Sequence, residues 1–201
     1  MFKLWEIKYK WKFIFWKYIC GAKLYSDGKQ IAPMLPEFPY FVKCKMCNTF
    51  YWLNEENKIA EQGFRSNKKE WEEADKAEFL TLNEYQEAID LRIFNDNKEE
   101  HYIRLKYWWT FNDKIRENKN ITFNENEEKL YEENCIKLIS LLDENEINNK
   151  IMIAELFRNI GEFNKCIDFF NKIKEEEYSW IIDILRKECS KNNKKVVILN
   201  Q

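Results

Sequence analysis

Apolar and polar side chains alternate at the start of the chain. Between Trp5 and Phe15 every odd position is apolar or aromatic, whereas the even positions from 6 to 12 carry Glu6 or lysine. A repeat of two puts successive side chains on opposite faces of a strand. The pattern predicts a half-buried strand over residues 5–15. Residues 50–53 are a candidate for a second short strand, and residues 21–43, with several Gly and Pro, are expected to form turns and loops.

Helical periodicity replaces this alternation from about residue 66 onward. Thr81-Leu82-Asn83-Glu84 has the form of a capping box, in which Thr81 accepts from a backbone amide and Glu84 reaches back. It predicts the start of a helix. Apolar residues at four-residue spacing predict a helix near 100–118, and others mark helices at about 131–142 and after residue 178. The Asn- and Glu-rich residues 119–127 are expected to be a loop.

The change from period two to period 3.6 lies between residues 53 and 70. It predicts a ribbon-like β module over residues 1–57 and a helical domain over residues 58–201. The expected fold class is therefore mainly α, with a small β module in front.

Residues 147–180 resemble a tetratricopeptide repeat. Ala154 falls in the Leu-Gly slot of the first helix, Gly161 at the turn, Cys166 in the small-residue slot and Phe170 in the aromatic slot of the second helix. Ala154 and Cys166 are small enough for two helices to approach closely. The pattern is broken at two positions, since Lys150 stands where Trp is common and Tyr178 where Pro is common.

This resemblance implies helical hairpins of the tetratricopeptide type and the binding of a peptide or protein on a concave face. Residues 83–89 resemble a second, degenerate repeat of the same kind. Stable arrays need about three units, so the other helices are expected to complete the core. Fold alone does not establish function.

A C-x-x-C knuckle is formed by Cys44 and Cys47, and Cys20-Gly21 resembles the remaining half of a second one. Together with the flanking strands they resemble a zinc ribbon, which implies zinc at Cys20, Cys44 and Cys47. A structural zinc site takes four protein ligands. The fourth ligand is His101, a residue of a partner, or none; the alternative is a degenerate ribbon without metal.

The segment Trp108-Trp109-x-Phe111-Asn112-Asp113, after a ribbon and before further helices, resembles a group of uncharacterised bacterial proteins. That resemblance adds an expectation of fold and no activity. The chain has 1 His and lacks the Gly-rich phosphate loops and metalloprotease motifs of common enzymes. The sequence therefore predicts a protein that is not an enzyme.

Charge is divided unevenly along the chain. The first 50 residues carry nine Lys and three acidic residues, whereas the remainder carries 24 basic and 32 acidic residues. Lysines interrupt every apolar run near the N-terminus, so neither a signal peptide nor a membrane span is expected. The expected location is the cytoplasm, where thiols stay reduced or bind metal.

Three functions fit these observations. The first is a non-enzymatic adaptor that binds a protein partner through exposed rings of a central helix, here Tyr107, Trp108, Trp109 and Phe111. The second is a nucleic-acid binder that uses the basic N-terminal ribbon. The third is a small inhibitor or immunity-type protein that blocks a larger enzyme.

Two features of the central helix leave alternatives open. Because neighbouring helical positions lie about 100° apart, the four rings either surround a helix that is buried on all sides or leave part of their surface to a partner. Trp109, Asn112, Asp113 and Arg116 share one helical face. They either line a polar pocket or include a solvated Asp113–Arg116 pair.

Overall fold

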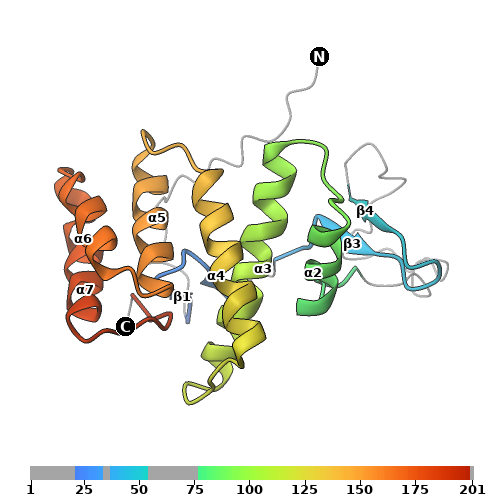
Figure 1. Cartoon of the computed structure of the whole chain (residues 1–201), viewed down its shortest axis with the longest axis horizontal. Coiled ribbons are helices and arrows are strands. Elements are labelled where there is room, and N and C mark those ends of the chain that lie inside the picture. Colours follow the sequence, from blue (N-terminus) through green and yellow to red (C-terminus); the bar gives the residue numbers. More distant parts are fainter. Residues whose placement is uncertain (1–20, 34–36, 54–76, 200–201) are drawn as a thin grey trace. The chain divides into compact units, whose positions relative to one another are not determined.

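The computed structural model describes residues 21–33, 37–53 and 77–199 (Figure 1). The protein is mainly α, with helices packed in pairs after small β-hairpins. The strands are β1 (Lys23–Leu24), β2 (Gln30–Ile31), β3 (Phe41–Lys43) and β4 (Phe50–Trp52). The helices are α2 (Leu82–Asp90), α3 (Asn97–Glu117), α4 (Glu125–Ser140), α5 (Ile147–Asn159), α6 (Phe163–Asn171) and α7 (Ser179–Ser190).

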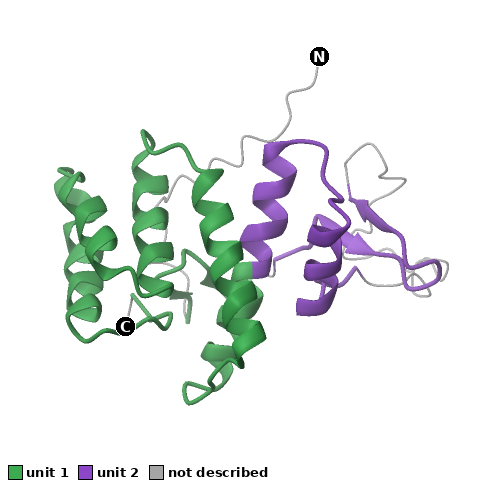
Figure 2. Cartoon of the chain, viewed as in Figure 1, with its two compact units in different colours: residues 1–35, 108–201 green, residues 36–107 purple. Residues whose placement is uncertain are grey.

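The chain divides into two compact units (Figure 2). Unit 1 comprises residues 1–35 and 108–201, and unit 2 comprises residues 36–107, so the division falls inside α3. The predicted boundary near residue 57 lies outside the described residues, as does the predicted strand over residues 5–15. The β-hairpins are divided between the units: β1–β2 belongs to unit 1 and β3–β4 to unit 2.

Unit 1 is built on α4, α5, α6 and α7, which lie side by side (Figure 1). Gly161 lies in the connection between α5 and α6. Its φ of 88° is the left-handed conformation that glycine adopts easily and that ends a helix. The core of this stack combines residues of α5, α6 and α7 with two from the α6–α7 connection and two from the ends of the unit: Leu24, Ile151, Ile153, Ala154, Cys166, Phe169, Phe170, Ile173, Tyr178, Ile181, Ile182, Leu185, Cys189 and Leu199.

The C-terminal segment of unit 1 closes onto its N-terminal hairpin. Tyr25 and Ile198 form an antiparallel bridge, and the amide of Leu199 donates to the carbonyl of Leu24 at 2.8 Å. Residues 21–43 were expected to be turns and loops throughout. They contain short strands as well, because Gly28 (φ 78°) turns the chain so that β1 and β2 pair.

Unit 2 packs the aromatic β3–β4 hairpin with α2 and the first part of α3. The ring of Phe41 lies 4.7 Å from that of Trp52, which in turn lies 5.4 Å from Tyr102 of α3. β4 confirms the strand expected at residues 50–53. Thr81 caps α2 with the reciprocal bonds predicted for its capping box, so this helix start is confirmed.

Candidate functional site

The four rings expected to bind a partner are buried. Trp108 and Phe111 have 0% of their surface exposed, Tyr107 has 1% and Trp109 has 6%. Their burial favours the alternative in which these rings pack inside the protein. The reason is that each ring points into a different neighbourhood, as the 100° step between adjacent positions requires. These residues contribute to packing.

A buried polar network begins at the β1–β2 turn of unit 1. Asp27, 1% exposed, forms an ion pair with Arg116 and accepts from the amide of Asn112 at 2.8 Å. Arg116 also pairs with Asp113 at 2.6 Å, and Lys29 reaches Asp113 at 2.6 Å. The predicted Asp113–Arg116 pair is present, but the arginine is buried and serves a network. Burial opposes its charge, yet the two carboxylates raise the pKa of Arg116.

The network continues through Tyr131 of α4. Its hydroxyl lies 2.9 Å from the Oδ1 atom of Asn112 and 3.0 Å from that of Asn159, and accepts from the indole of Trp108 at 3.1 Å. Burial raises the pKa of Tyr131 well above its usual value, so the hydroxyl stays protonated. The side-chain amide of Asn159 donates to the carboxylate of Glu155 at 3.1 Å. This bond connects Tyr131 to the ion pair of Glu155.

Glu155 and Arg158 form an ion pair inside α5, and both are 0% exposed. The guanidinium donates through Nε and Nη2 to the two carboxylate oxygens at 2.7 and 2.6 Å. Its remaining donors bind the carbonyls of Asn193 and Lys195. Burial disfavours the charge, but Glu155 outweighs it and raises the pKa of Arg158. The signal in the sequence that could have identified it was a charged pair three residues apart, with Glu155 inside the apolar run of residues 151–157.

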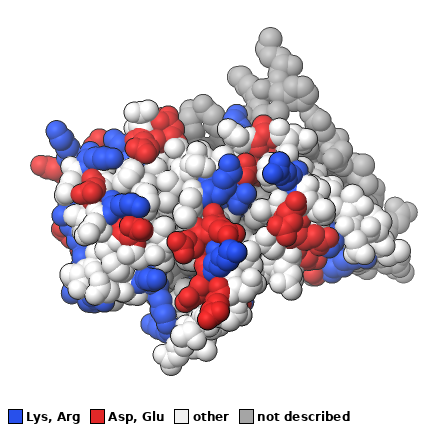
Figure 3. All heavy atoms as spheres, in the orientation of Figure 1, with Lys and Arg blue, Asp and Glu red and all other residues white. Residues whose placement is uncertain are grey.

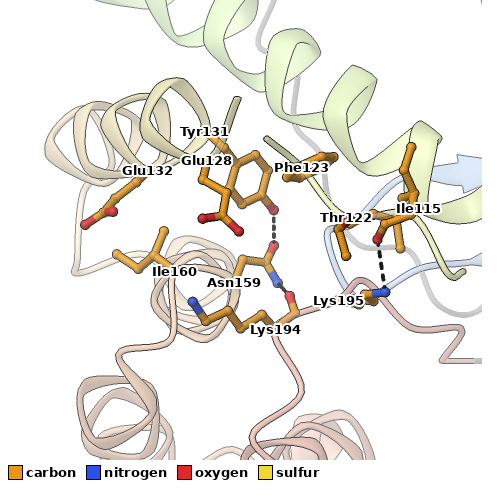
Figure 4. Close-up of a pocket in the computed structure, with 11 residues that line it drawn as sticks. Ile115, Thr122, Phe123, Glu128, Tyr131, Glu132, Asn159, Ile160, Lys194 and Lys195 are labelled. Carbon is orange, nitrogen blue, oxygen red and sulfur yellow. Dashed lines mark hydrogen bonds between the residues drawn. The ribbon is translucent and has the colours of Figure 1, made fainter. Parts of the chain in front are cut away.

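An open pocket lies beside this network in unit 1 (Figure 4). Its volume is about 200 Å³. Tyr131 and Asn159 form its floor, joined by the hydrogen bond drawn there. The other lining residues are Ile115, Ile121, Thr122, Phe123, Glu128, Glu132, Ile160, Lys194 and Lys195. A site for a drug-sized ligand occupies at least about 300 Å³. The pocket is therefore suited to something smaller, such as one side chain.

Charged groups of both signs line this pocket. Glu128 and Glu132 lie one turn apart on α4, and their side chains make no ion pair or hydrogen bond with the described residues. The same holds for the ammonium group of Lys194, which lies at the pocket in Figure 4. Lys195 is fixed instead, because it donates to the carbonyls of Lys119 and Ile121 at 2.6 and 3.2 Å.

The predicted metal ligands are described only in part. Cys20 lies outside the described residues. Cys44 and Cys47 belong to the β3–β4 loop, where Asn48 (φ 58°) donates its amide to the carbonyl of Cys44 at 2.8 Å. Hydrogen bonds from Thr49 and Cys44 lower the pKa of the Cys47 thiol. Among residues 21–33, 37–53 and 77–199 no group of three metal-ligating side chains occurs, so His101 does not join these cysteines there.

In the described part of the basic N-terminal region, most lysines form ion pairs with acidic side chains. Lys29, Lys43 and Lys45 pair with Asp113, Glu87 and Glu78 at distances of 2.6 to 2.9 Å. On the face drawn in Figure 3, acidic and basic side chains are interspersed. This part of the molecule therefore gives no support to a basic nucleic-acid surface.

No helix in the described part of the chain is long and apolar enough to cross a membrane. Compared with protein-family models, curated proteins and solved structures, the chain shows no match to any of them.

Proposed function

We propose that this protein is a non-enzymatic protein-interaction module with a tetratricopeptide-like hairpin, and that its pocket receives one basic side chain of a partner. The observation that carries this proposal is the open pocket of about 200 Å³ in the helical stack of unit 1, with two unpaired carboxylates on its wall. The α5–α6 hairpin and its turn at Gly161 support the tetratricopeptide-like interpretation.

The lining of the pocket fits the two parts of a lysine or arginine side chain. Phe123 and Ile160 offer apolar surface to the methylene stem, and such stems pack on apolar surface while the charged head stays polar. Glu128 and Glu132 are then available to the head as ion-pair partners. Lys194 is the competing internal cation, so the partner's side chain would displace it from the neighbourhood of these carboxylates.

The test is affinity capture from a lysate of the native host followed by mass spectrometry. The variant Glu128→Gln/Glu132→Gln removes both pocket charges. The matched control Glu125→Gln/Glu133→Gln removes two exposed carboxylates of the same helix that do not line the pocket. We expect a specific partner to be retained by the parent and the control and lost from the pocket variant. Retention by both variants would exclude the pocket, and absence of any specific partner would exclude the interaction module.

We also propose zinc binding at Cys20, Cys44 and Cys47. The tight loop at Asn48 supports it, because an αL residue after the second cysteine is typical of a knuckle whose amides face the metal-bound sulfurs. Elemental analysis of the purified chain should find zinc, and Cys44→Ser should lose it. Zinc-free protein whose melting temperature does not change in chelator would contradict this proposal.

A further inference from the structure

Two cysteines from neighbouring helices face each other in the core of unit 1. Cys166 belongs to α6 and Cys189 to the last turn of α7, 23 residues further along the chain. Their sulfur atoms are 3.4 Å apart. Cys166 is fully buried, whereas 6% of the surface of Cys189 remains exposed. The function proposed above does not use this pair.

The distance is short enough for a covalent bond after a small movement. A disulfide needs sulfur atoms about 2.05 Å apart, so the two sulfurs must approach by about 1.4 Å. Cys189 lies in the final turn of α7, two residues before its C-cap at Lys191. The ends of helices fray most easily, so this position can supply the movement and admit a small reagent.

We propose that Cys166 and Cys189 are a thiol redox site, which forms a reversible intramolecular disulfide by exchange with a low-molecular-weight disulfide. This inference is independent of the protein-binding function. It assigns a chemical modification to two cysteines that otherwise contribute only to the packing of the core.

The reaction is two successive exchanges. The thiolate of Cys189 attacks one sulfur of the small disulfide, forms a mixed disulfide and releases the first small thiolate. The sulfur of Cys166 then attacks the sulfur of Cys189, which breaks the mixed disulfide and releases the second. The two protons of the protein thiols end on the two small thiols. The protein dithiol is oxidised by two electrons and the small disulfide is reduced by two.

Cys189 is the thiol that reacts first, because it is the one with exposed surface. Its electrostatics agree with this order. A hydrogen bond from Cys166 and the positive charge of Arg158 lower the pKa of Cys189. The same hydrogen bond, together with burial, raises the pKa of Cys166. The second thiol is thus protected until the mixed disulfide has formed beside it.

The experiment uses the full-length chain without substitutions, and peptide mapping distinguishes Cys135, Cys166 and Cys189 from Cys20, Cys44 and Cys47. The folded protein is incubated with oxidised glutathione, quenched with acid and analysed by intact mass and non-reducing peptide mapping. We expect the peptide map to contain one disulfide between Cys166 and Cys189, with the linked peptides about 2 Da lighter than the sum of the free ones, and reversal by reduced glutathione. Cys135, buried alone on α4, should stay a free thiol and serves as the internal control.

Two single variants test the order of reaction. Cys166→Ser should accumulate a glutathione adduct on Cys189, because the resolving thiol is gone, whereas in Cys189→Ser the remaining thiol of Cys166 should acquire neither an adduct nor a disulfide. If either single variant fails to fold, the disulfide map of the protein that keeps both cysteines still tests the proposal. Thiols that stay free in the folded protein but pair after unfolding in urea would overturn the proposal, as would a disulfide that includes Cys135.

Discussion

At the scale of single residues, the buried ion pair of Glu155 and Arg158 joins two parts of unit 1. Desolvating two charges is costly, and attraction offsets this only when the remaining donors and acceptors are satisfied. Here the guanidinium meets both carboxylate oxygens and the carbonyls of Asn193 and Lys195. The pair therefore holds α5 and the C-terminal segment together through polar contacts.

Replacing Arg158 with methionine should destabilise the protein by about 3–5 kcal/mol, because it leaves the carboxylate of Glu155 buried without its counter-ion. Urea unfolding monitored by circular dichroism measures the cost. The double variant Glu155→Met/Arg158→Met should lose less stability than the sum of the two single variants, since it buries no unpaired charge. A cost below about 1 kcal/mol for Arg158→Met would show that the pair is not buried as described.

His101, the single histidine of the chain, is expected to make the free energy of unfolding depend on pH below neutrality. Burial lowers its pKa below the ordinary value of 6.5, and its buried Nε2 atom has no hydrogen-bond partner among the described residues. The unfolded chain therefore binds the proton more readily than the folded one. Its contribution to stability is complete above the unfolded pKa and is lost as the pH falls through 6.5 toward the folded value.

The variant His101→Gln should remove this loss. Between about pH 7 and pH 5, the free energy of unfolding of the parent should fall more steeply than that of the variant, by at most about 1.4 kcal/mol per pH unit for one proton. Carboxylates are the same in both proteins, so the difference isolates the histidine. Parallel stability curves would show that the ring is accessible to solvent in the folded state.

Sequence reasoning at this scale succeeds for local pairs and fails for distant ones. The spacing of Asp113 and Arg116 correctly predicted their contact, because helical neighbours are fixed by the helix itself. The spacing left open whether these residues line a polar pocket or form a solvated pair, because the decisive partner Asp27 is 89 residues away from Arg116. Nothing in a local pattern reports such a contact. The pocket was missed for the same reason, because its lining comes from α3, the α3–α4 connection, α4, the end of α5 and the C-terminal segment.

At the scale of elements, helix starts follow from local chemistry. The capping box at Thr81 was predicted from its sequence and is present. Asn124 and Glu127 form a second capping box at the start of α4, inside a stretch that was expected to be loop through residue 127. Asparagine caps as well as serine or threonine, so the signal was available. The short strands β1 and β2 left no comparable signal, because two residues are too few to show a period.

Replacing Asn124 with alanine should cost about 1 kcal/mol, which is the usual loss when an N-cap side chain is removed. The amide of Glu127 would lose its acceptor at 3.0 Å, whereas the carboxylate of Glu127 would keep its bonds to the backbone amide of residue 124 and to Lys114. Thermal and urea unfolding provide the measurement. Asn126→Ala, an exposed change in the same turn, is the control and should have little effect. Equal stability of both variants would contradict the capping role.

At the scale of the whole chain, the change to helical periodicity correctly predicted a mainly α fold. It did not reveal that the four rings of residues 107–111 in α3 are all buried, because periodicity identifies a buried face only when an exposed face exists for contrast. Trp108 and Phe111 of this segment have no exposed surface. An exposed binding surface has to be sought elsewhere, at the pocket of unit 1.

The C-terminal segment after α7 closes unit 1 without belonging to a helix. Val196 and Leu199 are buried, and the carbonyl of Val197 accepts from the amide of Ser26 at 2.8 Å. Upstream carbonyls of the segment bind Arg158 and Asn159. Removing the segment would expose two apolar contacts worth about 1.5–3 kcal/mol each and would leave buried donors of α5 unpaired.

A chain ending at Asn192 should therefore lose more than about 3 kcal/mol of stability, measured by urea unfolding. The double variant Val196→Ala/Leu199→Ala keeps the backbone carbonyls and removes only apolar contacts, so it should lose less. Hydrogen exchange distinguishes the two effects further. In the truncated chain the amides of α5 should exchange faster than in the alanine variant, because the truncated chain alone lacks the carbonyls that bind Arg158 and Asn159. Unfolding of the truncated chain at the same urea concentration as the parent would mean that this segment does not close the unit.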